Sequence, residues 1–161
     1  MLITIIQAII FLSFISFLWI KFKQPLPSIS ESWYRLKYPA NLLFTIFIIS
    51  IGILMPYHIV GNPIFFLLSG AGLIFTGVAS MFKYDIIIGR IHAICAFISG
   101  IAALAGLGVN FDYWIPTLMF LLSFWIIYTL KIIGLIKQTF VWWLEIVTFL
   151  SVIIGLIYIY L

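Results

Sequence analysis

Charged residues are scarce in this chain. Only 7% of its 161 residues are charged, whereas about a quarter are charged in an ordinary soluble domain, and 66% are hydrophobic. A soluble fold of this size could not bury so much apolar surface. The formal net charge of +4 is spread over short segments between apolar runs and forms no contiguous basic face, so we expect no nucleic-acid partner.

Cysteine is nearly absent as well. The single Cys95 excludes a disulfide within the chain. Because Cys95 lies inside an apolar run, we interpret it as a small hydrophobic residue of a helix. No thiol metal site follows from this pattern, and we expect neither a bound metal nor another cofactor.

Long apolar runs are what the chain has in abundance. Each is about twenty residues long, the length that a helix needs to cross a hydrocarbon core of about 30 Å. The sequence therefore predicts an all-α fold, a polytopic transmembrane helical bundle with six spans that forms one domain over residues 1–161. The spans are expected at about residues 2–20, 41–60, 64–82, 87–108, 113–136 and 140–161, with an interfacial loop at residues 21–40.

The interfacial loop carries a helix-start signal after two prolines. Ser28 with Glu31 three positions later matches a capping box, in which each side chain satisfies a backbone N–H of the first helical turn. A short helix lying at the membrane surface is therefore expected here.

The distribution of basic residues indicates which side of the membrane each connection faces. They fall in or beside the first, third and fifth connections, and the second and fourth connections have none. An excess of lysine and arginine in short loops marks the cytoplasmic side. We therefore expect a multi-pass protein of the prokaryotic plasma (inner) membrane, with both termini extracytoplasmic. The basic residues are Lys21, Lys23, Arg35, Lys37, Lys83, Arg90, Lys131 and Lys137.

Small residues recur at helical spacing in the third and fourth spans. Gly72, Thr76 and Ser80 share one face of the third span, and Ala96 and Gly100 share one face of the fourth. In lipid, such faces let helix backbones approach closely. The two spans are expected to pack through these faces, either against each other, or against a second copy of the chain or another membrane protein. Membrane lipids are the other expected partner.

Polar residues of the first and third connections form the candidate site. On the expected topology they converge on the cytoplasmic side, where they would anchor helix ends, or bind lipid head groups or a small ligand. A metal-dependent hydrolase is the alternative, but a single histidine is few for a metal site. The candidate cluster is Ser30, Glu31, Arg35, Asp85, Arg90 and His92, of which His92, Asp85 and Glu31 are the only metal-ligand candidates.

Two further polar sets lie elsewhere in the expected bundle. Lys131 and Glu145 stand nearly symmetric about the last turn, which predicts an intramembrane ion pair, or a relay in a small transporter or channel subunit. At the opposite membrane face, His58, Asn62, Asn110 and Asp112 are expected in loop ends that contact water.

A family resemblance rests on three features. Ile29-Ser30-Glu31 follows the first span, the third span is rich in glycine, and His92 opens the fourth. This pattern resembles small bacterial six-span membrane proteins of unknown function and is more distantly similar to the DRAM/Frag/Sfk group. The resemblance implies a six-helix bundle with a role in lipid organisation or membrane homeostasis.

A looser likeness concerns the CREST membrane hydrolases, whose serine, aspartate and histidine residues bind zinc. Their paired histidine motif is missing, because His92 has no histidine partner at helical spacing. We therefore favour a non-enzymatic integral membrane protein over a hydrolase of this type. The transporter or channel subunit stays open as the third hypothesis, and the sequence names no specific ligand for any of the three.

Overall fold

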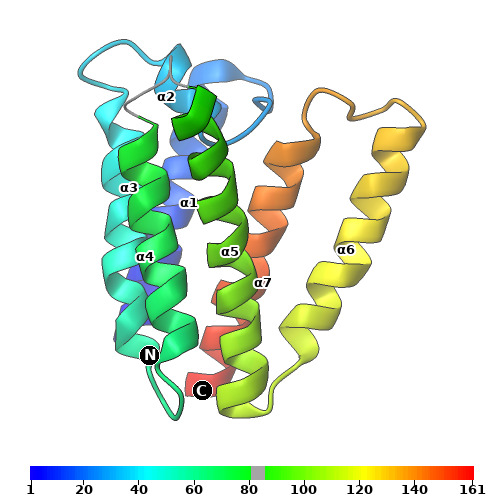
Figure 1. Cartoon of the computed structure of the whole chain (residues 1–161). Helices are drawn as coiled ribbons and strands as arrows, with labels where there is room; N and C mark the ends of the chain where they lie inside the picture. Colours follow the sequence, from blue (N-terminus) through cyan, green and yellow to red (C-terminus); the bar gives the residue numbers. More distant parts are fainter. Residues whose placement is uncertain (81–85) are drawn as a thin grey trace.

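The computed structural model describes residues 1–80 and 86–161. Over these residues the chain is all-α, with seven α-helices and one 3-10 turn (Figure 1). The elements are α1 (Leu2–Phe22), α2 (Glu31–Arg35), α3 (Leu42–Leu54), η1 (Met55–His58), α4 (Ile64–Ala79), α5 (Ile86–Phe111), α6 (Ile115–Ile132) and α7 (Phe140–Tyr160).

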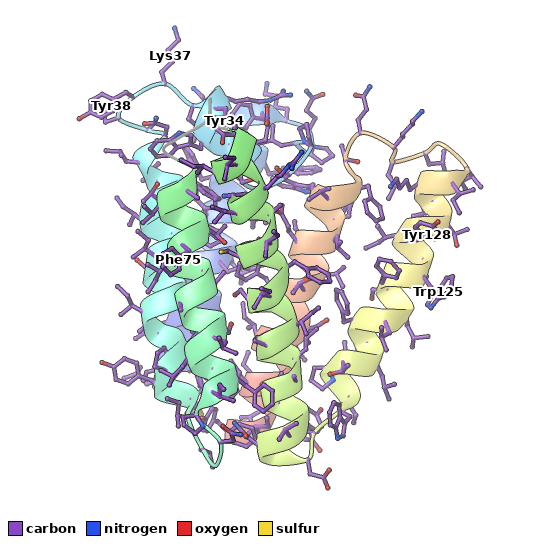
Figure 2. The ribbon with its side chains drawn as sticks, viewed as in Figure 1. Tyr34, Lys37, Tyr38, Phe75, Trp125 and Tyr128 are labelled. Atoms are coloured by element: carbon purple, nitrogen blue, oxygen red, sulfur yellow. The ribbon has the colours of Figure 1, made fainter. Side chains whose placement is uncertain are left out.

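Four helices are long and apolar enough to cross a membrane: α1, α5, α6 and α7. Large apolar side chains cover their outer surfaces, which in water would be a strongly unfavourable arrangement. Trp125 of α6 is 63% exposed and points away from the rest of the bundle (Figure 2). Such surfaces are typical of helices that face lipid.

Two apolar helices are shorter than the sequence predicts. The second expected span is helical as α3 and then tightens into η1, because Pro56 has no N–H to continue the α-helical pattern. The third expected span is α4, which has 16 residues. The described chain thus has four helices of membrane-spanning length and two shorter apolar ones.

Close backbone contacts hold α3, α4 and α5 together. A Cβ on Gly70 would lie 2.6 Å from the carbonyl oxygen of Gly52, and one on Gly72 would lie 2.8 Å from that of Cys95. Thr76 is also buried on the same face of α4. The small-residue faces of the third and fourth expected spans therefore pack within the chain, where α4 and α5 form the most extensive helix pair.

Aromatic side chains join the first, second and last apolar helices. The rings of Phe14 and Phe47 stack with centroids 4.3 Å apart, and those of Phe11 and Phe149 stack at 5.1 Å. All but Phe149 are buried. These contacts place α1, α3 and α7 around one core, although α7 is last in the sequence.

The two ends of the bundle differ in charge. The α1–α3 and α6–α7 connections lie at one end, with the start of α5, whereas both termini lie at the other (Figure 1). We call the first of these the basic end. Its exposed basic residues are Lys21, Lys23, Arg35, Lys37, Arg90 and Lys137.

Candidate functional site

Three residues of the predicted cluster, Ser30, Glu31 and Arg35, lie together in α2 and at its N-cap. The Ser28 hydroxyl accepts a hydrogen bond from the Glu31 amide at 3.2 Å and lies 3.0 Å from the Ser30 hydroxyl, so half of the predicted capping box forms. Arg35 Nε donates to Glu31 Oε1 at 3.4 Å. Beside this pair, burial and the Glu31 charge raise the pKa of Tyr34.

The other predicted cluster residues belong to the third connection and α5. His92 Nδ1 lies 2.9 Å from the Thr76 carbonyl oxygen of α4, so Nδ1 carries a hydrogen and donates a hydrogen bond to this oxygen. Arg90 is exposed at the basic end. Asp85 lies outside the described residues. In the part of the chain that the structure describes, no three His, Cys, Asp or Glu side chains are grouped closely enough to hold a metal ion.

Lys131 and Glu145 have separate partners. Lys131 Nζ lies 4.2 Å from the centroid of the Phe140 ring, a cation–π contact. Glu145 Oε2 instead accepts a hydrogen bond of 2.5 Å from the backbone amide of Ile29. Over residues 1–80 and 86–161, the one ion pair is that of Arg35 with Glu31.

Glu145 meets Ile29 because the first connection folds onto the start of α7. The Pro27 carbonyl accepts a hydrogen bond from the Trp142 amide at 3.1 Å, which satisfies one of the free N–H groups of the first helical turn. Leu26 and Ile29 are only 1% and 2% exposed, and Trp142 is 1% exposed. Residues 26–30 are therefore an integral part of the bundle.

A cavity of about 100 Å³ lies beneath this connection, between α1, α3, α4, α5 and α7. Ser30 and Glu145 line it near the basic end, and Gln7 and Met55 line it further toward the opposite end. Most of its wall is apolar, as is usual for small-ligand sites. Among the described residues of the predicted cluster, only Ser30 lines it.

A second polar group lies at the far end of the bundle. His58 Nε2 is 2.7 Å from Gln7 Oε1, and His58 Nδ1 is 3.4 Å from the Tyr160 hydroxyl. The prediction that His58 contacts water is wrong, since it is 2% exposed. The turn at Pro56 brings the ring between α1 and α7. Gln7, a polar residue within an apolar run, was the available signal for this partner.

The loop residues predicted at this end are placed as expected. Asn110 Nδ2 donates to the Asn62 carbonyl at 2.9 Å, and the Asn62 amide donates back to Asn110 Oδ1 at 3.3 Å. These two bonds join the α3–α4 connection to the end of α5. Asp112 is exposed in the next connection.

Fold and composition together define the chain as an all-α protein with several apolar helices of membrane-spanning length. No protein-family model matches the sequence, and no similar curated protein or solved structure was found. Any functional conclusion therefore depends on the geometry of the chain's own residues.

Proposed function

We propose that this chain is a non-enzymatic, six-span integral membrane protein of a prokaryotic inner membrane whose basic end faces the cytoplasm and binds anionic lipid head groups. The finding that supports this most directly is the charge difference between the two ends. The exposed basic residues lie at the end formed by the α1–α3 connection, the start of α5 and the α6–α7 connection, while Asp112 lies at the opposite end. Lysine and arginine collect in short cytoplasmic loops.

Six spans follow if the two shorter apolar helices also cross. α3 and η1 follow one another without a break and together cover Leu42–His58, which at about 1.5 Å per residue is about 25 Å long. That length is close to a thin hydrocarbon core, and small mismatches are accommodated at a modest energetic cost. Both α3 and α4 run alongside the longer helices (Figure 1).

Arg35 and Arg90 are the residues that we assign to head-group binding. Both are exposed at the basic end, and Arg35 lies on α2, whose Trp33 and Tyr34 are partly buried, as side chains at head-group depth would be. A basic residue at an anionic surface contributes about 1 kcal/mol. Removing both arginines should therefore weaken the retention of anionic lipid by about tenfold or more.

The test is native mass spectrometry of the full chain, purified with a mixture of phosphatidylglycerol and phosphatidylethanolamine. The double variant Arg35→Gln/Arg90→Gln should lose phosphatidylglycerol adducts while phosphatidylethanolamine adducts stay constant. Lys137→Gln is the control, because it removes charge at the same end but on the α6–α7 connection. Unchanged adducts in the double variant, or an equal loss in the control, would contradict the proposal.

A further inference from the structure

Three hydroxyl groups that line the cavity beneath the first connection already donate hydrogen bonds to backbone carbonyl oxygens. Thr76 Oγ1 donates to the Gly72 carbonyl, Thr148 Oγ1 to the Leu144 carbonyl and Ser99 Oγ to the Ser69 carbonyl, each at 2.8 Å. A hydroxyl has one hydrogen and two lone pairs. The oxygens of these side chains therefore remain available to the cavity only as acceptors.

The carboxyl group of Glu145 belongs to the same wall and adds a charged acceptor when it is ionised. One of its oxygens takes the Ile29 amide, and an ionised carboxylate has further acceptor positions but no donor. Among the described residues, no basic side chain lies within ion-pairing distance of it, and Lys131 contacts Phe140 instead. A carboxyl group at membrane depth ionises only at a cost in free energy, and a cation beside Glu145 would offset that cost.

Side-chain donors facing the cavity are few and engaged. The Gln7 amide nitrogen is directed at Met55 Sδ at 3.5 Å, and the Ser30 hydroxyl pairs with Ser28. An occupant that only accepts hydrogen bonds, such as a carboxylate or a phosphate, would find few donors and would be repelled by an ionised Glu145. The wall is complementary to a cation that donates several hydrogen bonds.

Volume and wall chemistry limit the size of that cation. A cavity of about 150 Å³ holds benzene, with six non-hydrogen atoms, so about 100 Å³ holds roughly four. The mostly apolar remainder of the wall suits a short alkyl group. We propose that this cavity is a binding site for ammonium or for a small primary ammonium ion no larger than ethylammonium. The N–H groups of this ion would donate to Glu145 and to the hydroxyl oxygens of α4, α5 and α7.

The experiment uses the full chain in lipid nanodiscs, with ethylammonium chloride as the probe and the unfolding temperature read from tryptophan fluorescence. Ethylammonium should raise the unfolding temperature in a saturable manner, because a ligand that binds only the folded state stabilises it. Tetramethylammonium and sodium chlorides at equal ionic strength should not, because tetramethylammonium has no N–H group and sodium donates no hydrogen bond.

Two variants and one control locate the site. Glu145→Gln keeps an acceptor for the Ile29 amide but removes the charge, and it should weaken ethylammonium binding at least tenfold. Thr148→Val keeps the side-chain shape but removes the oxygen, and it should weaken binding several-fold. Glu31→Gln removes the carboxylate that pairs with Arg35 and should leave binding unchanged.

Three results would overturn the proposal. They are the absence of a saturable shift with ethylammonium, an equal shift with tetramethylammonium, and an undiminished response in both Glu145→Gln and Thr148→Val. The first would mean that the cavity holds only water, and the second would mean that the effect is one of salt. The site is separate from the lipid-binding arginines, so the two proposals succeed or fail independently.

Discussion

The backbone amide of Ile29 donates a hydrogen bond of 2.5 Å to the carboxylate of Glu145, which lies 116 positions further along the chain. With the bond from the Trp142 amide to the Pro27 carbonyl, this contact ties the first connection to the last helix. Through Ile29 and Ser30, the connection lines part of the cavity. The same carboxylate thus serves the fold and the proposed ammonium site.

Removing this acceptor should loosen the first connection. In Glu145→Ala the buried Ile29 amide loses its partner, and leaving a buried donor unsatisfied costs about 1–3 kcal/mol. We expect a lower free energy of unfolding in detergent titration and faster hydrogen exchange at residues 26–30. Lys131→Gln, which loses only the contact with Phe140, should change little. If Lys131→Gln is as destabilising as Glu145→Ala, an ion pair between the two residues explains the data better.

The crossing of α3 and α4 should not tolerate a methyl group. In Gly70→Ala the new Cβ would meet the Gly52 carbonyl oxygen at 2.6 Å, and this neighbour is backbone that cannot rotate away. Overpacking of this kind typically costs about 1–3 kcal/mol of unfolding free energy. Gly89→Ala in α5 is the matched control, since among the described residues no atom beyond its chain neighbours and its own helix backbone lies within 4 Å of its Cβ position. It should be neutral or stabilising. Equal thermal stability of the two variants would contradict the observed crossing.

Gln7 and His58 should be energetically coupled. Gln7→Leu leaves the buried His58 Nε2 without its partner and should cost about 1–3 kcal/mol. The double variant Gln7→Leu/His58→Leu should cost less than the sum of the single changes, because both polar groups are then absent. A double-variant cycle on the unfolding free energy measures this coupling. Strict additivity would show that the contact does not contribute.

The sequence predicted where the helices lie better than it predicted which side chains contact one another across the bundle. Apolar runs located the six apolar helices of the described residues. The four-residue spacing of Gly72 and Thr76 marked a packing face of α4 but left open whether α5, a second copy or another protein packs against it. The predicted capping interaction of Ser28 with the Glu31 amide also forms. Each of these features depends on residues close together in sequence, whose periodicity can be read directly.

Partners across the bundle were not predictable in the same way. Lys131 suits Glu145 by charge and by expected depth, yet Glu145 binds a backbone amide, and every residue except proline carries such an amide. His58 next to Pro56 looked like a loop end, but the turn buries it against Gln7. The cavity has no sequence signature, because its wall combines residues from five helices that are far apart in the sequence.

The orientation and number of crossings can be measured by cysteine labelling in spheroplasts. In a Cys95→Ala background, single cysteines replace Lys37 and Lys137 at the basic end, and Asn62 and Asp112 at the other. We predict that a membrane-impermeant maleimide labels positions 62 and 112 in intact spheroplasts, and positions 37 and 137 only after permeabilisation. Labelling of two positions from the same end on opposite sides of the membrane would contradict the six-span account, and the reverse pattern would contradict the proposed orientation.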